Sequence, residues 1–208
     1  LYTNIVDVDD DYGRAIAAGA DLSNNSIGTN TAPNGFDCNW EGDYGNTDAL
    51  IDSMARGNAT FSNGPLPIVW ANGNERGSGR CGTAYGTTAP PANAKNHITV
   101  GAINSNDESI TSFTSWGPTE WVPAQNRLDG RIKPDVSAPG CQVGGDGGLT
   151  SPTADSNTAY GSYCGTSMAS PTTAGCVALI LQDFRVRYPA QPDPAGSMFK
   201  AWLANSAV

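Results

Sequence analysis

The feature that most constrains this chain is the heptad Gly-Thr-Ser-Met-Ala-Ser-Pro at residues 165–171, which opens an unusually apolar run. The run predicts a helix over 167–187, so Ser167 stands at a helix N-terminus, where backbone N–H groups are unpaired and the helix dipole favours negative charge. A serine nucleophile needs an exposed hydroxyl, an N–H for the developing oxyanion and a fixed backbone, and this position supplies all three. A lone Gly-Thr-Ser is usually a helix cap, but the complete heptad indicates a nucleophile.

Several further motifs precede the heptad and cover most of the chain. They are the segments 19–28, 68–75, 95–102, 113–118 and 129–140. Their sequences and their order resemble those of the subtilases, the subtilisin-like serine proteases. The resemblance implies an α/β fold with a mostly parallel sheet flanked by helices, and the activity of a serine endopeptidase that acts on polypeptides. The predicted alternation of helices and strands agrees with this fold class.

The resemblance also assigns roles to individual residues. It makes Ser167 the nucleophile and Asn74 the side-chain donor to the oxyanion. Loss of such a donor lowers kcat by about 10²–10³, a figure that was measured in subtilisin itself. The segment 26–28 resembles the one that pairs with the substrate backbone by strand addition. Glu75, at the rim of the primary specificity pocket, favours a basic substrate side chain. The residues expected along the substrate cleft are Ser26, Ile27, Gly28, Ala71, Gly73 and Glu75.

The other two members of a subtilase triad do not occur in their usual contexts. The family carries its catalytic Asp and His upstream, in Asp-Ser/Thr-Gly and His-Gly-Thr-His motifs, and neither motif is present here. The one histidine, His97, lies in a strand-like run and is interpreted as structural. A triad of His97, Asp135 and Ser167 in the chymotrypsin-like order is disfavoured. A protease of that fold would carry Gly-Asp-Ser-Gly around its serine, and this chain does not. An α/β-hydrolase would place its His after the serine.

We therefore expect residues 1–208 to be one domain that forms the C-terminal two-thirds of a subtilase catalytic domain. It would lack the N-terminal strands with the catalytic Asp and His, and an upstream segment of the same precursor would supply them. The chain has no initiator Met, which agrees with a start inside a longer precursor. Two alternatives stay open from the sequence. One is a non-catalytic peptide-binding module, and the other is a subtilase-like acyl transferase.

Charge and cysteine content bound the partners and the compartment. A net charge of −9 argues against a nucleic-acid partner. No run approaches the roughly 18 apolar residues of a membrane helix. The 5 cysteines favour an oxidising compartment and hence a secreted protein. We expect a disulfide between Cys141 and Cys164 at the base of a hairpin. A second is expected between Cys38 and Cys81, in loops that by the resemblance wall the specificity pocket. Cys176 is predicted to be a free, buried thiol.

Residue patterns also predict the local structure. Thr47 is the predicted N-cap of its helix, Pro171 is expected in a first helical turn, and the Ala89–Pro90 bond is expected to be cis by the resemblance. Helices are predicted near 8–19, 47–58, 167–187 and 195–206, strands near 21–26, 66–71, 97–103, 109–114 and 135–138, and a hairpin between 141 and 164.

The chemistry expected of Ser167 requires no cofactor. The resemblance nevertheless leaves room for structural calcium, because subtilases often bind this ion. The acidic residues ahead of the first helix are the local candidates for ligands, although carboxylates in that position commonly serve only the helix dipole. They are Asp7, Asp9, Asp10 and Asp11.

Overall fold

A parallel sheet forms the centre of the computed structural model. The structure describes residues 8–29, 31, 35–60, 64–78, 81, 84–119, 130–144 and 147–207. The sheet has four strands in the order β1-β2-β3-β4, namely β1 (Ser23–Asn25), β2 (Ile68–Ala71), β3 (Ile98–Asn104) and β4 (Val136–Cys141). All three neighbouring pairs are parallel. The predicted fold class, a mostly parallel sheet with flanking helices, is confirmed.

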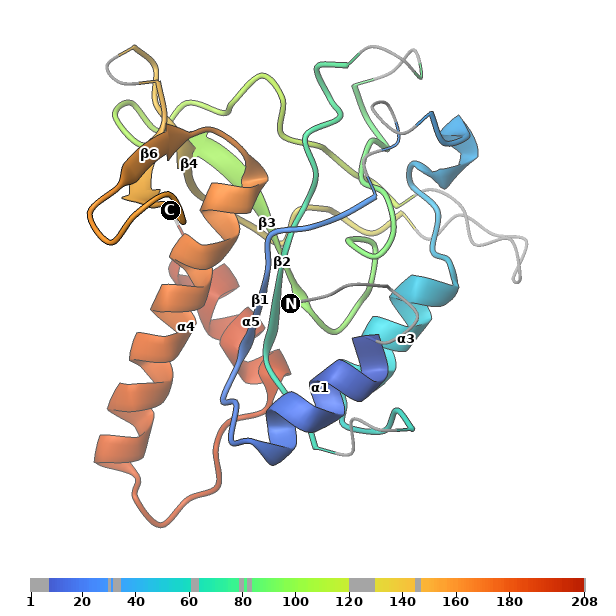
Figure 1. Ribbon diagram of the computed structural model, residues 1–208. Coiled ribbons are helices and arrows are strands. Elements are labelled where there is room, and N and C mark those ends of the chain that lie inside the picture. The colour runs from blue at the N-terminus through green and yellow to red at the C-terminus, as the bar shows by residue number, and fades with distance from the viewer. Residues whose placement is uncertain are drawn as a thin grey trace.

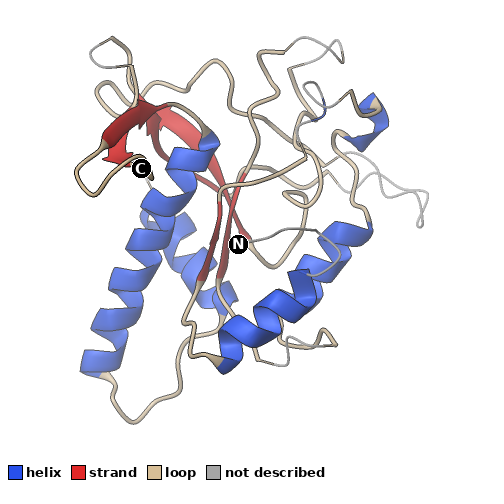
Figure 2. Cartoon of the chain, viewed as in Figure 1, coloured by secondary structure: helices blue, strands red, loops and turns tan. Residues whose placement is uncertain are grey.

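Helices cover both faces of the sheet (Figure 1 and Figure 2). The helices α1 (Val8–Ala17) and α3 (Asn46–Ala55) lie on one face, and α4 (Thr166–Arg187) and α5 (Gly196–Ser206) lie on the other. Strand β2 contacts the helices on both faces, because its successive side chains point to opposite sides of the sheet. Ile68 and Trp70 pack with α1 and α3, whereas Val69 packs with α4 and α5. A strand buried on both faces is therefore apolar throughout rather than alternating.

A hairpin and a disulfide set the position of the N-terminus of α4. The antiparallel strands β5 (Leu149–Pro152) and β6 (Tyr160–Tyr163) form the predicted hairpin between β4 and α4. The disulfide Cys141–Cys164 closes its base with a Cα separation of 4.5 Å. Next to it, the N–H of Gly165 donates to the carbonyl of Gly140 at 2.9 Å. A Cβ on Gly140 would lie 2.7 Å from the carbonyl oxygen of Gly165, so only glycine permits this approach.

The second predicted disulfide, Cys38–Cys81, is also present, with a Cα separation of 5.6 Å. It fixes the short 3-10 helix η2 (Cys38–Trp40) to the loop that follows β2. Cys176 is free, as predicted, but the prediction that it is buried was wrong. It lies on a face of α4 that packs against no described element, together with Leu179 and Val186, which are 67% and 75% exposed. Apolar residues lie on all sides of α4, but the sheet packs against only one side of the helix.

Three local predictions were wrong. Residues 109–114 form no strand; they make an isolated bridge between Ile103 and Ile110, and threonine hydroxyls in the segment bond to the backbone of β3 instead. Helix α3 begins one residue before Thr47, and Asp48 accepts from the N–H of Gly45 at 2.9 Å in place of a threonine cap. The cis bond in the segment near residue 90 is Pro90–Pro91, not Ala89–Pro90.

The outer side of β1 carries no paired strand within the described residues, so β1 is an edge of the sheet. In the same part of the chain, none of the helices combines the length and the apolar character that crossing a membrane requires.

Candidate active site

Ser167 is the second residue of α4 and is held by Ser26, which follows β1 directly. Pro171 was predicted to lie in the first turn of the helix, but it lies further along, inside α4. A proline at this position has no N–H to donate to the carbonyl four residues earlier, which is that of Ser167. The hydroxyl of Ser26 donates to this carbonyl at 2.7 Å, and the hydroxyl of Ser167 donates to the carbonyl of Ser26 at 3.2 Å. The sequence analysis missed this pairing, although Pro171 was the available signal.

The side chain of Asn74 is oriented by Thr166. Both the backbone N–H and the hydroxyl of Thr166 donate to Oδ1 of Asn74, each at 3.0 Å. The hydroxyl of Thr166 also accepts from the N–H of Gly73 at 3.2 Å. With Oδ1 occupied in this way, Nδ2 of Asn74 points to the other side, 3.7 Å from the position that a Cβ on Gly165 would take. The amide donor is therefore presented at the N-terminus of α4.

Ser167 and Asn74 line one cavity of about 60 Å³ at the carboxyl ends of β1 and β2. This is the edge at which parallel sheets bind ligands. The structure thus brings together the two residues that the sequence analysis placed at the reacting centre. The other six expected cleft residues line the same cavity, namely Ser26, Ile27, Gly28, Ala71, Gly73 and Glu75. The sequence analysis did not single out Thr87, Ala89 and Ala92, which also line it.

Glu75 is 4% exposed and lies in the wall of this cavity. Its backbone N–H donates to the hydroxyl of Ser115 at 2.9 Å. A carboxylate in the wall of a small pocket favours a positively charged group inside it, because few water molecules screen the two charges there.

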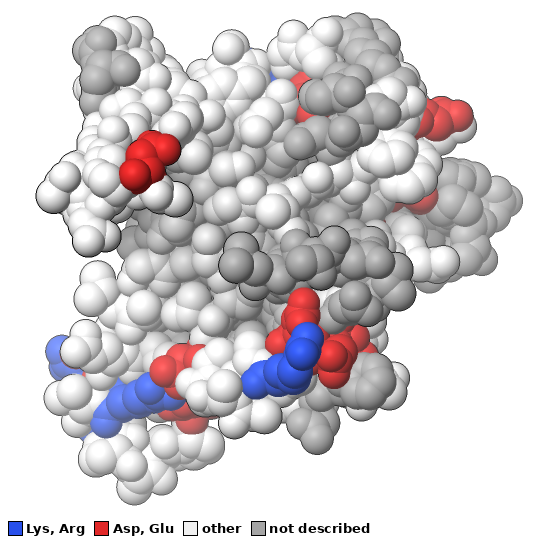
Figure 3. All heavy atoms as spheres, viewed as in Figure 1, with Lys and Arg blue, Asp and Glu red and all other residues white. Residues whose placement is uncertain are grey.

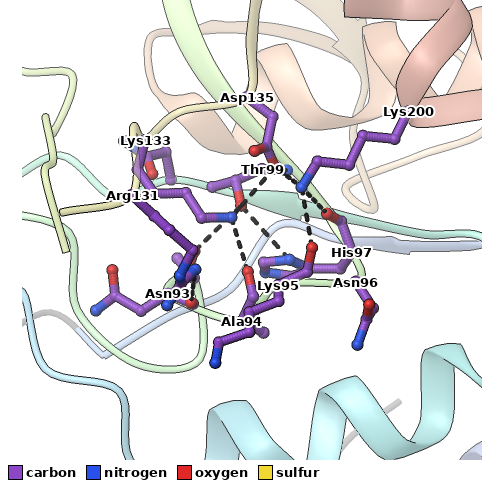
Figure 4. Close-up of polar contacts among 12 residues, drawn as sticks. Asn93, Ala94, Lys95, Asn96, His97, Thr99, Arg131, Lys133, Asp135 and Lys200 are labelled. Atoms are coloured by element: carbon purple, nitrogen blue, oxygen red, sulfur yellow. Dashed lines mark hydrogen bonds and ion pairs between the residues drawn. The ribbon is translucent and has the colours of Figure 1, made fainter. Parts of the chain in front are cut away.

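His97 lies outside this cavity, in a buried polar cluster with Lys133, Asp135 and Lys200 (Figure 4). Nζ of Lys133 donates to the hydroxyl of Thr99 at 2.6 Å and to Asp135 at 3.2 Å. Lys200 pairs with the same carboxylate at 2.9 Å and donates to the carbonyl of His97 at 3.1 Å. Ser167 is not part of this cluster, so the structure does not assemble a triad of His97, Asp135 and Ser167.

Burial dominates the electrostatics of this cluster. It lowers the pKa of His97 well below its ordinary value, and the charge of Lys133 lowers it further. Burial also lowers the pKa of Lys133 to about 8, against the opposing effect of Asp135. For Asp135, burial would raise the pKa, but Lys133 and Lys200 outweigh it and hold the pKa below its usual value. His97 is therefore a neutral ring at pH 7.

The acidic candidates for calcium lie at the start of α1. Asp9, Asp10 and Asp11 stand in its first turn, and Arg14 forms ion pairs with Asp10 and Asp11. Asp7 lies outside the described residues. Within those residues, no three His, Cys, Asp or Glu side chains are arranged to hold a metal ion. Structural calcium stays a prediction.

Comparison with known proteins identifies relatives in sequence and in fold. The model of the Subtilase family matches residues 3–208. Serine protease AprX of Bacillus subtilis (strain 168) is 35% identical over 120 residues, which cover 50% of this chain and 25% of AprX. Minor extracellular protease Vpr of the same organism is 39% identical over 105 residues, which cover 49% of this chain and 10% of Vpr. The chain spans a quarter or less of the length of these relatives.

A solved structure shows the same fold. The self-cleaved protease domain of PatA superposes on this chain with a TM-score of 0.65 at 23% identity. The match covers 99% of this chain and 60% of that domain. At this level of identity the likeness extends to the fold alone.

Proposed function

The chain belongs to the subtilase family, and on that premise we propose that it carries the nucleophile and the oxyanion donor of a serine endopeptidase. In the proposed reaction Oγ of Ser167 attacks the carbonyl carbon of a peptide bond while a general base takes its proton. The C–N bond then breaks, the amine leaves with that proton, and water hydrolyses the acyl-enzyme to release the acid and free Ser167. Nδ2 of Asn74 and the N–H of Ser167 stabilise the oxyanion. The observation that carries the proposal is the single cavity shared by Ser167 and Asn74, whose amide Thr166 orients.

The substrate in this proposal is an extended polypeptide. Segment 26–28 borders the cavity, and its backbone pairs with the substrate by strand addition. Two observations support this assignment. Ile27 is 47% exposed, and a Cβ on Gly28 would meet nothing within 4 Å, so a second chain has room to lie along the segment. By the family resemblance, Glu75 in the cavity wall tolerates a basic side chain next to the scissile bond.

The general base and its orienting acid come, in this proposal, from an upstream segment of the same precursor. In the structure the hydroxyl of Ser167 donates a hydrogen bond to the carbonyl of Ser26, and a carbonyl does not serve as a general base at neutral pH. The one histidine of the chain is buried in the other cluster. A further residue with a basic nitrogen is therefore needed beside Ser167.

The edge of the sheet offers a place for such a segment. On the α4 side of β1, a hollow of about 610 Å³ is lined by Leu22, Ala178, Leu181 and Val186, among others. On the α1 side, a hollow of about 330 Å³ is lined by Tyr12, Ala15, Leu22 and Leu66, among others. A strand added to β1 would point alternate side chains toward the two faces and so into the two hollows. This arrangement supports docking of the upstream segment at β1.

Export of the protein is part of the same proposal. The two disulfides of the structure are typical of proteins that fold in oxidising compartments.

The test is kinetic and uses the 208-residue chain with and without the upstream segment. Purified residues 1–208, shown by intact mass to carry no upstream peptide, should hydrolyse casein poorly. Loss of triad members leaves only about 10³–10⁴-fold catalysis over water, a figure from well-studied serine proteases. The protein with its upstream segment should hydrolyse casein at a much higher rate, and a fluorophosphonate should label it at Ser167. The variant Ser167→Ala should lose both properties.

Other outcomes would redirect the proposal. Full turnover by residues 1–208 alone, abolished by Ser167→Ala, would return His97 to consideration as the base. Absence of labelling in the complete protein would favour a peptide-binding module. Mass spectrometry after addition of a free amine would reveal an acyl transferase, because the product would then contain the amine in place of water.

A further inference from the structure

The segment 113–118 resembles a family motif, and the structure places it behind the turn that carries Asn74. Ser115, in the middle of this segment, is 0% exposed. Its N–H donates to the carbonyl of Gly73 at 2.9 Å, and its hydroxyl accepts from the N–H of Glu75 at 2.9 Å. Its carbonyl accepts from the side chain of Asn72. One residue therefore contacts the turn on both sides of Asn74.

The fit between Ser115 and the turn is close. Gly73 has φ 105°, in the region that favours glycine, and a Cβ there would lie 3.0 Å from the hydroxyl oxygen of Ser115. On the cavity side, Thr166 holds the side-chain oxygen of Asn74. Asn74 is therefore held from two directions: Thr166 fixes its side chain, and Ser115 fixes the backbone from which that side chain extends.

We propose that Ser115 is the residue that positions the oxyanion donor, a role that rests on the proposed function of Asn74. An oxyanion donor is effective only when it lies about 2.7–3.1 Å from the developing charge, so a small displacement of the turn weakens it. Two hydrogen bonds between the buried Ser115 and the backbone on either side of Asn74 oppose such a displacement.

The neighbouring residue provides a matched control. Thr114 is 2% exposed, and its hydroxyl accepts from the N–H of Ala102 in β3 at 3.0 Å. It is a buried hydroxyl of the same segment, but its hydrogen bond goes to the sheet rather than to the turn. Removal of this hydroxyl in Thr114→Val should weaken the fold in a similar way and leave Asn74 in place.

The first test compares Ser115→Ala with Thr114→Val by NMR of the 208-residue chain. In Ser115→Ala the amide hydrogen of Glu75 should exchange with solvent about tenfold faster, the equivalent of one lost hydrogen bond. The side-chain amide resonances of Asn74 should shift in the same variant. In Thr114→Val the amide of Ala102 should exchange faster, and the Asn74 resonances should stay unchanged. Equal shifts in both variants, or none in Ser115→Ala, would overturn the proposal.

A second variant and a kinetic measurement complete the test. If Ser115→Ala does not fold, Ser115→Cys retains a weak acceptor at the same place and is measured in the same way. In the protein with its upstream segment, Ser115→Ala should lower kcat about tenfold with KM unchanged, and Ser115→Cys should restore part of it. If Asn74→Ala lowers kcat and Ser115→Ala does not, this proposal alone fails. If Asn74→Ala has no effect, the proposed function fails.

Discussion

The two polar clusters of this molecule lie at opposite ends of the sheet. Ser26 and Asn74 follow the carboxyl ends of β1 and β2, where they meet Ser167. His97 and Asp135 precede the amino ends of β3 and β4 directly. The first cluster consists of the neutral side chains of Ser26, Asn74 and Ser167 at a cavity whose wall also includes Glu75. The second consists of buried ionisable groups that bond to one another and to the backbone (Figure 4).

The comparison shows that ionisable content alone is a poor guide to the site. Perturbed pKa values gather at active sites, but structural ion-pair networks perturb them as well. Here the perturbed groups, His97 and Lys133, are both buried. The ammonium of Lys133 is bonded to Ala94, Thr99 and Asp135, whereas Nε2 of the neutral His97 ring has no hydrogen-bond partner among the described residues. In the view of Figure 3, basic and acidic side chains gather over α1 and the C-terminal half of α4, and separate acidic side chains lie elsewhere, one of them over the β5–β6 hairpin. A donor aimed into an accessible cavity marks the site better.

The largest expected effect is on stability, in the cluster at the amino ends. Asp135→Ala would remove the counter-charge that Lys133 and Lys200 share, and the pKa of the buried Lys133, about 8 with Asp135 present, would fall further. Breaking a buried pair in this way lowers the free energy of unfolding by about 3–5 kcal/mol. Urea unfolding at pH 7 measures the loss. In the protein with its upstream segment, labelling of Ser167 per folded molecule should not change, and a parallel loss of labelling would show that the two clusters are coupled.

Asn74→Ala should affect chemistry and leave stability nearly unchanged. In the protein with its upstream segment, kcat should fall by about 10²–10³, as for the equivalent loss in subtilisin, because the donor acts only in the transition state. Steady-state kinetics and urea unfolding of the same preparation separate the two effects. A higher KM with unchanged kcat would mean that Asn74 binds substrate rather than the oxyanion.

Ser26→Ala should have a smaller effect, of about 1–2 kcal/mol in the free energy of unfolding, because the carbonyl of Ser167 loses its donor. Ser170→Ala is the matched control, since its hydroxyl bonds to Asn24 and not to Ser167. In a Pro171→Ala background the helix regains an N–H for that carbonyl, so Ser26→Ala should cost less there. Strict additivity in this double-mutant cycle would contradict the account.

The last effect is the pH dependence that His97 contributes, which is small at pH 7 and grows as the pH falls. Its folded pKa is lowered, so below about pH 6.5 the unfolded state binds a proton that the folded state does not, and stability falls as the pH falls. The slope reaches about 1.4 kcal/mol per pH unit. His97→Leu should remove this slope between pH 6.5 and 5 in urea titrations. An unchanged slope would mean that His97 is charged in the folded protein.

Much of this molecule could be predicted from short segments of the sequence. The heptad at 165–171 predicted a serine at a helix N-terminus, because helix starts depend on local residues. The order of the motifs predicted the fold class and the grouping of Asn74 with Ser167. The disulfide Cys141–Cys164 could be predicted from the hairpin that the two residues flank, and Cys38–Cys81 once the family resemblance had placed its loops. Local patterns also misled. The threonines at 109–114 favour a strand by their residue type, but in the structure the hydroxyls of Thr111 and Thr114 bond to the backbone of Ala102 instead.

Only the tertiary structure decided how Ser167 and Asn74 are held. The hydroxyl of Ser26 meets the carbonyl of Ser167 across 141 residues, Thr166 meets Asn74 across 92, and Ser115 meets Glu75 across 40. No local pattern encodes such pairs, because hydroxyl groups bond to whatever the fold brings within about 3 Å. The sequence by itself determined which residues are suited to the chemistry. The packing of the sheet and α4 decided which neighbours hold them and which buried ionisable groups take no part.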